Sequence, residues 1–271
     1  MSRIAAVFDE LRARGEAALV PYFTAGDPDL GVTRELVLAA IAEGADAIEL
    51  GVPFSDPTAD GPALQRAAGR ALAAGTSLPR VLELVADLRA ATAVPLVLFG
   101  YYNPFFRYGI EPLARDAASA GADGFLCVDL PHEEAGPLRD AARAAGLDVI
   151  ALLAPTTPPP RLRAIAAASS GFLYFVSVLG TTGARAELPA ELPELVRRVR
   201  GVTALPVGVG FGVSRPEQAG WIAGFADAVI VGSALARLVE DGERSGAAGR
   251  TAVFLAELRA AMRAAAEARV G

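Results

Sequence analysis

Two acidic residues in very different surroundings are the first candidates for chemistry. Glu49 is the single charged residue of the apolar stretch Ala47–Val52, and burial raises the pKa of a carboxyl group because it penalises the charged form. Asp60 lies in the next segment, the polar and proline-rich Pro53–Pro62. A buried Glu beside a rigid loop that carries an Asp can act as an acid/base pair. Two structural explanations compete: Glu49 can form an ion pair inside the core, and Asp before Gly is a common turn residue.

Three glycine-rich segments in the last third of the chain indicate a bound anion. They are Gly180–Ala184, Gly208–Gly212 and Gly232–Ala234. One such segment is ordinary turn chemistry, whereas several together are typical of a phosphate cradle built from loops and helix N-termini. Ser214 and Ser233 are expected at helix starts, where the first backbone N–H groups are free to bind an anion. The sequence therefore predicts a phosphorylated ligand held by backbone dipoles.

Missing residue types narrow the chemistry further. The chain has 25 Lys and Arg residues, and all of them are arginine, so no lysine can form a Schiff base with a substrate. The single histidine, His132, and the single cysteine, Cys127, are too few for a zinc site with three histidines. We interpret His132 as an unreactive loop residue, and Cys127 and Trp221 as core. Carboxylates, hydroxyls and backbone dipoles must then carry the chemistry.

The elements that position these residues form a regular repeat of strands and helices. Apolar runs are each followed by a helical pattern, and most runs are apolar on both faces, which is typical of buried parallel strands. The predicted strands are Leu19–Thr24, Ala47–Val52, Leu96–Tyr101, Gly124–Asp129, Val149–Ala154, Phe172–Ser177, Val207–Gly210 and Ala228–Val231. The predicted helices include Ile4–Arg14, Thr33–Glu43, Pro79–Ala90, Pro112–Ala120, Glu133–Ala145, Pro193–Arg200 and Thr251–Arg269.

This pattern predicts an α/β fold, a single (β/α)8 TIM barrel with an extra N-terminal helix. An open, doubly wound sheet is the alternative. We find no linker, so residues 1–271 are expected to form one domain. In such a barrel the active site lies in the loops after the strands, which is where Asp60 and the glycine-rich segments fall.

A repeated phrase supports the count of units. Gly-Ala-Asp precedes two predicted strands, at Gly44–Asp46 and Gly121–Asp123, and a looser version stands at Gly224–Asp227. The glycine suits the C-terminus of a helix, and the aspartate suits the entry to the next strand. The phrase therefore indicates the same helix-to-strand turn at three places.

The composition excludes several classes of partner. The net charge is −6 and no cluster of basic residues is present, so we expect no nucleic acid binding. Apolar runs are strand-sized, so we expect no membrane span, and the N-terminus lacks the apolar core of a signal peptide. One cysteine excludes an internal disulfide and agrees with a reducing compartment, so a cytoplasmic location is expected.

Several segments together resemble one family, the alpha subunit of tryptophan synthase. In the family's order and over nearly the whole chain, they are Val20–Pro28, Glu49–Pro57, Ala59–Pro62, Asp129–Pro131, Thr182–Ala184, Gly210–Ser214 and Gly232–Ala234. The segment that begins at Glu49 is long and specific. One segment departs from the pattern: Gly180–Gly183 reads Gly-Thr-Thr-Gly, where the family usually has Gly-Val-Thr-Gly, and the Val178-Leu179 ahead of it is also unusual.

The resemblance implies a retro-aldol cleavage of indole-3-glycerol phosphate to indole and glyceraldehyde 3-phosphate. It implies that Glu49 shuttles protons, that Asp60 holds the indole N–H, and that Tyr174 lies near the substrate. The implied substrate-binding residues are Tyr22 and Phe211 for the indole ring, and Gly183, Gly212, Gly232 and Ser233 for the phosphate. The residue types agree, because an indole ring protonated at C3 is its own electron sink and needs neither a lysine imine nor a metal.

The resemblance also implies a partner. The family's consumer of indole is a pyridoxal-phosphate beta subunit, so an alpha2-beta2 heterotetramer is expected, with that cofactor on the beta subunit and none in this chain. The loops Pro53–Pro62 and Tyr101–Phe106 are expected at the interface, and Leu179–Leu188 is expected to close over the substrate. The alternatives are a stand-alone indole-3-glycerol phosphate lyase, an inactive barrel that activates a beta subunit, and a phosphosugar isomerase on the same fold.

Overall fold

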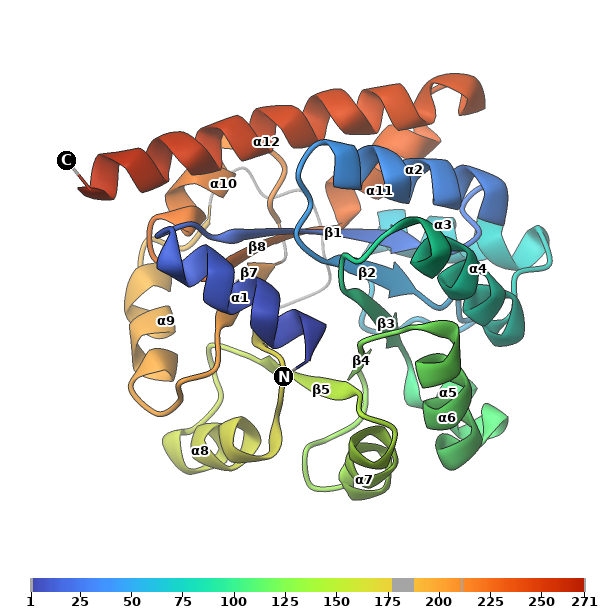
Figure 1. Cartoon of the computed structure of the whole chain (residues 1–271), viewed down its shortest axis with the longest axis horizontal. Helices are drawn as coiled ribbons and strands as arrows, with labels where there is room; N and C mark the ends of the chain where they lie inside the picture. Colours follow the sequence, from blue (N-terminus) through green and yellow to red (C-terminus); the bar gives the residue numbers. More distant parts are fainter. Residues whose placement is uncertain (1, 177–187, 211, 271) are drawn as a thin grey trace.

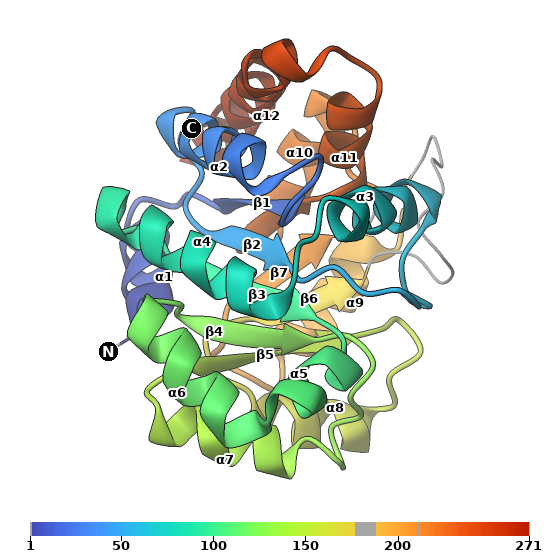
Figure 2. The same cartoon turned by 90° about the vertical axis from the view of Figure 1, so that its right-hand side faces the viewer.

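The strands form a closed parallel barrel surrounded by helices. The computed structural model describes residues 2–176, 188–210 and 212–270, and Figure 1 and Figure 2 show the barrel from two sides. The strands pair in sequence order, and β8 pairs with β1 to close the ring. Their bounds are β1 Ala18–Thr24, β2 Ile48–Gly51, β3 Leu96–Gly100, β4 Gly124–Cys127, β5 Asp148–Leu153, β6 Leu173–Val176, β7 Val207–Gly210 and β8 Ala228–Val231. The predicted TIM barrel is therefore confirmed.

The helices follow the strands around the outside of the barrel. Their bounds are α1 Arg3–Ala13, α2 Leu30–Ala42, α3 Pro62–Ala73, α4 Leu78–Ala91, α5 Tyr102–Tyr108, α6 Ile110–Ala120, α7 Gly136–Ala144, α8 Pro159–Ala168, α9 Leu192–Arg200, α10 Pro216–Ala223, α11 Ser233–Glu240 and α12 Ala247–Val270. The long C-terminal helix α12 runs along α2 and α10 (Figure 1). No helix among the described residues is both long and apolar enough to cross a membrane.

Two helices differ from the sequence prediction, and each has a proline in its first turn. The helix predicted to start at Glu133 begins at Gly136, and Pro137 occupies its first turn, where a missing N–H costs nothing. The segment Tyr101–Phe106, predicted as a loop, is largely helix α5, in which Pro104 again lies in the first turn. The prediction of a loop was wrong there, because a proline in the first turn is compatible with a helix.

Two hydrophobic clusters give the barrel its layers. The larger one fills the space between the strands and the surrounding helices. The smaller one fills the barrel interior and includes Ile4, Phe8 and Leu11 of α1. The Phe8 ring lies 5.5 Å from that of Phe172, at the start of β6. The extra N-terminal helix therefore covers the N-terminal end of the barrel and leaves the C-terminal end for chemistry.

The Gly-Ala-Asp phrase builds the same turn twice at the N-terminal end, and the looser version at Gly224–Asp227 places its aspartate in the same way, although Gly224 has φ of −61°. Gly44 and Gly121 have φ of 89° and 95°, in the left-handed region that glycine adopts without strain. Each aspartate then accepts the N–H of the first residues of a neighbouring strand at 2.8 Å; the pairs are Asp46 with Leu19, Asp123 with Leu96, and Asp227 with Val207. Each also pairs with an arginine, namely Asp46 with Arg259, Asp123 with Arg89 and Asp227 with Arg200.

Candidate active site

A small cavity lies at the C-terminal ends of the strands, inside the barrel. Its volume is ≈ 30 Å³, and its lining residues are Tyr22, Glu49, Asp60, Leu64, Phe99, Tyr174, Gly212, Gly232 and Ser233. The structure thus brings together seven of the nine residues expected at the site. The other two, Gly183 and Phe211, lie outside the described residues, as does most of the segment Leu179–Leu188.

Glu49 enters the cavity from the middle of β2. The register of the barrel sets it beside Tyr22 of β1 and Val97 of β3. Its side chain is fully buried, and neither carboxyl oxygen has a hydrogen-bond partner among the described residues. Burial without a compensating charge raises its pKa to about 8. At neutral pH the group is therefore a protonated acid, which excludes the structural ion pair considered from the sequence.

Asp60 reaches the same cavity from the loop between β2 and α3. Its N–H donates to Pro57 O at 3.0 Å, and its own carbonyl accepts from Gln65 Nε2 at 2.9 Å, so the backbone on both sides is held. Burial raises the pKa of its carboxyl to about 6, and a hydrogen bond with Tyr101 opposes that rise. Asp60 is therefore mostly ionised at pH 7, while Glu49 keeps its proton.

Tyr101, at the end of β3, was missed as a site residue because its segment was read only as an aromatic loop. Its side chain is 3% exposed and its hydroxyl accepts the N–H of Ala59 at 3.1 Å. The same hydroxyl bonds the Asp60 carboxyl, and its ring lies 5.3 Å from that of Phe54. One side chain thus contacts the Asp60 loop at three points. The signal in the sequence was a tyrosine as the last residue of the predicted buried strand Leu96–Tyr101.

Two tyrosines in the barrel interior, Tyr22 and Tyr174, each place the ring and hydroxyl against a glycine of the neighbouring strand. A Cβ on Gly51 would come within 2.0 Å of the Tyr22 hydroxyl, and a Cβ on Gly210 within 2.0 Å of the Tyr174 hydroxyl. Only glycine leaves room for these rings. Burial raises the pKa of both phenols well above the usual value, so both remain neutral hydroxyls near Glu49.

The glycine-rich side of the cavity combines loop and helix N-terminus. Gly212 has φ of +92°, and Ser233 is the first residue of α11, directly after Gly232. The first N–H groups of a helix have no partner inside it and attract anions. Ser214 is placed differently from the prediction: it precedes α10, whose N-cap is Arg215, and its N–H donates to Gln218 Oε1 at 2.9 Å.

No arginine lines this cavity among the residues that the structure describes. A bound phosphate would therefore meet backbone N–H groups and one serine hydroxyl, as the glycine-rich segments predict. Of the remaining candidates, His132 and Cys127 line a different cavity. Trp221 is 40% exposed and packs edge-on against Phe225, so its interpretation as core was wrong.

The fold and the cavity define a β/α-barrel enzyme with two buried carboxyl groups, Glu49 and Asp60, at the C-terminal end of its strands. The family model described as "Tryptophan synthase alpha chain" matches residues 8–267. The tryptophan synthase alpha chain of Citrifermentans bemidjiense is 55% identical over 240 residues, 89% of this chain and 90% of that relative. That of Geotalea uraniireducens is 52% identical over 97% of this chain and 99% of its own length.

Solved structures give the same result. A structure of Mycobacterium tuberculosis tryptophan synthase matches with a TM-score of 0.90 and 42% identity, over 97% of this chain and 98% of that one. Tryptophan synthase subunit alpha from Legionella pneumophila matches with a TM-score of 0.90 and 38% identity, over 97% of this chain and 99% of that one. The chain belongs to the tryptophan synthase alpha chain family.

Proposed function

We propose that this chain cleaves indole-3-glycerol phosphate to indole and glyceraldehyde 3-phosphate as the alpha subunit of tryptophan synthase, with Glu49 and Asp60 as its catalytic pair. The observation that carries this assignment of roles is the unpartnered, buried Glu49 carboxyl, with a pKa of about 8, in the same cavity as Asp60, with a pKa of about 6. One group is an acid and the other an anion at neutral pH.

The reaction needs those two states. Glu49 donates its proton to C3 of the indole ring, which becomes an indolenine that can accept electrons. Asp60 accepts a hydrogen bond from the ring N1–H and stabilises the positive charge that develops there. The Glu49 carboxylate then takes the proton of the hydroxyl on the carbon attached to C3. The bond between that carbon and C3 breaks, its electrons restore the aromatic ring, and an aldehyde is left.

The other lining residues divide between the two halves of the substrate. Tyr22, Phe99 and Leu64 offer apolar surface for the indole ring, together with Phe211. Gly212, Gly232 and the N-terminus of α11 at Ser233 hold the phosphate, together with Gly183. The Tyr174 hydroxyl lies near the glycerol chain.

The proposal extends to the partner and the compartment. A pyridoxal-phosphate beta subunit takes up the indole, in an alpha2-beta2 heterotetramer, and this chain itself holds no cofactor. The enzyme is cytoplasmic. The support for a partner is membership of the tryptophan synthase alpha chain family.

The test measures how fast the Glu49→Gln variant cleaves indole-3-glycerol phosphate, with the release of indole as the readout. The amide cannot exchange the proton at C3, so kcat should fall by about 10³-fold or more while KM stays near the wild-type value. Asp60→Asn should lower kcat more than it changes KM, because the charge matters most in the transition state. Glu83→Gln, exposed on α4, is the matched control. Wild-type turnover in Glu49→Gln would refute the assignment.

A further inference from the structure

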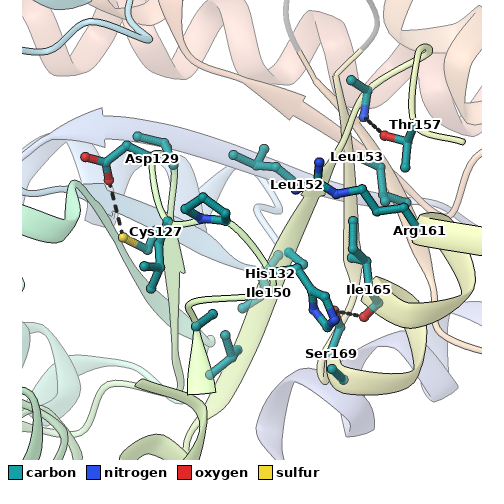
Figure 3. A pocket seen from close by; sticks show the side chains of 18 of the residues that line it. Cys127, Asp129, His132, Ile150, Leu152, Leu153, Thr157, Arg161, Ile165 and Ser169 are labelled. Carbon is teal, nitrogen blue, oxygen red and sulfur yellow. Dashed lines mark hydrogen bonds between the residues drawn. The ribbon is translucent and has the colours of Figure 1, made fainter. Parts of the chain in front are cut away.

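A second, larger cavity lies around β5, between α7 and α8, and its lining includes Ile150 and Leu152 of the interior cluster as well as residues on the outer face of β5. Its volume is ≈ 420 Å³, within the range of small-molecule sites. Figure 3 shows Cys127 and Asp129 on one side of it, Thr157 and Arg161 on the other, and His132 between them. The residues that line it and the residues that line the Glu49 cavity do not overlap.

The cavity exists because the helix layer does not cover β5. Val149 and Ala151 on the outer face of β5 are half-buried, whereas β1, β2, β3, β7 and β8 are buried along their whole length. The pairing of β4 with β5 ends at Leu126 and Ile150, so the two strands separate beyond this point. The result is an apolar floor open to solvent, which is the usual mark of a binding surface.

The charged groups that line this cavity are two arginines and one aspartate. Arg139 of α7 donates from Nη1 to the neutral His132 carbonyl at 2.8 Å and forms no ion pair among the described residues. Arg161 of α8 pairs with the exposed Glu133 at 3.0 Å. The one lining carboxylate, Asp129, already accepts the N–H of Tyr102 at 2.7 Å. A guanidinium group without a carboxylate thus borders an apolar cavity.

We propose that this cavity is a binding site for a small aromatic carboxylate. The ring of the ligand lies on Val149 and Ala151, and its carboxylate replaces the missing anionic partner of Arg139. A charge-assisted hydrogen bond from guanidinium to carboxylate gives the site its selectivity for anions. A neutral ligand of the same shape lacks that interaction.

The test uses phenylacetate as the probe and phenylacetamide as its neutral match. His132 lines the cavity and is the single histidine of the chain, so its ring signals in an NMR titration of the full chain report occupancy. Phenylacetate should shift these signals saturably, and phenylacetamide should bind about tenfold more weakly or worse. Equal binding of the two probes, or no binding of phenylacetate, would overturn the proposal.

Variants locate the site. Arg139→Leu should weaken phenylacetate binding about tenfold, and Arg143→Leu, exposed on the same helix, should leave it unchanged. Ala151→Leu keeps the charge but fills the floor, so it should abolish binding even if Arg139→Leu folds poorly. Arg139 contacts His132, so the substitution of Arg139 can itself shift the His132 signals. A second readout is therefore the rate at which a neutral disulfide reagent modifies Cys127, the single cysteine, which also lines the cavity. Bound phenylacetate should slow this modification.

A final measurement separates the two cavities. With the site saturated by phenylacetate, the KM for indole-3-glycerol phosphate should not change. Competitive inhibition with a constant equal to the dissociation constant would place the probe in the Glu49 cavity and refute the second site. The binding readouts do not depend on cleavage, so they stand even if the proposed reaction fails.

Discussion

At the scale of single residues, the Glu49 carboxyl, which we propose as the catalytic acid, also makes the stability of the fold depend on pH. In the unfolded chain it has an ordinary pKa near 4.5, whereas burial in the fold raises this pKa to about 8. The unfolded state therefore releases the proton more readily, and the stability of the fold falls as pH rises from about 4.5 to about 8. A protein without this carboxyl should lose that pH dependence.

Comparison of Glu49→Gln with wild type in urea unfolding at several pH values checks this. The difference in the free energy of unfolding, variant minus wild type, should grow by about 3 kcal/mol between pH 4 and pH 7, because one pKa unit corresponds to about 1.4 kcal/mol. Glu83→Gln should show no such trend. A constant difference across this range would mean that Glu49 is ionised in the fold.

Tyr101 offers a second test at this scale. Its hydrogen bond lowers the pKa of Asp60, so Tyr101→Phe should raise that pKa above about 6. The acidic limb of the pH profile of kcat/KM should then move up by about one unit. Tyr102→Phe, at the neighbouring position and without a contact to Asp60 among the described residues, should leave the limb in place. A general loss of activity at every pH, with no shift of the limb, would leave Tyr101 only a structural role.

At the scale of elements, the aspartates of three helix-to-strand turns, Asp46, Asp123 and Asp227, hold neighbouring strands together where the chain enters the barrel. Asp123 is the most strongly bound, since it is 5% exposed, pairs with both Arg89 and Arg3, and accepts the Leu96 N–H. Removing one partner of a buried ion pair leaves the other charges without compensation. These turns therefore serve stability at the end of the barrel opposite the active site.

Asp123→Ala should lower the free energy of unfolding by about 3 kcal/mol or more, measured in urea. The matched control is Asp140→Ala, which removes an exposed pair with Arg143 and should cost less than about 0.5 kcal/mol. The folded fraction of Asp123→Ala should keep the wild-type KM. Equal losses in the two variants would show that the turn adds nothing to strand pairing.

Much of this was predictable because the responsible patterns are local. The alternation of strand and helix patterns predicted the barrel. The position of Glu49 as the single charged residue of an apolar strand predicted a buried acid. The exposure of Trp221 and the short loop before α5 were not predictable, because they depend on which helix faces are covered by neighbours distant in sequence. The same holds for the bond from Tyr101 to Asp60, which joins the end of β3 to the loop between β2 and α3, 41 residues apart in the chain.

At the scale of the whole molecule, the response to a beta subunit distinguishes an alpha subunit of tryptophan synthase from a stand-alone indole-3-glycerol phosphate lyase. The Asp60 loop and α5 both lie at the C-terminal end of the barrel, where the proposed beta subunit docks. Docking there should fix the Asp60 loop in its working position. A stand-alone lyase would need no such help.

Addition of the cognate beta subunit should therefore raise the rate of indole formation at least about tenfold, which requires only about 1.4 kcal/mol of transition-state stabilisation. The measurement is turnover of indole-3-glycerol phosphate with and without the partner, with an unrelated pyridoxal-phosphate enzyme as control. Fast turnover of the isolated chain that the partner does not change would favour the stand-alone lyase.

Because α1 closes the N-terminal end of the barrel, it affects how Glu49 exchanges protons with the solvent. Below Glu49 the described part of the interior holds buried apolar side chains down to Phe172 and Phe8, and apolar side chains do not relay protons. Glu49 can exchange with the surroundings only through the mouth of the barrel. In the proposed reaction, substrate in that mouth keeps bulk water away from Glu49, and the hydroxyl of the molecule that Glu49 has just protonated returns the proton.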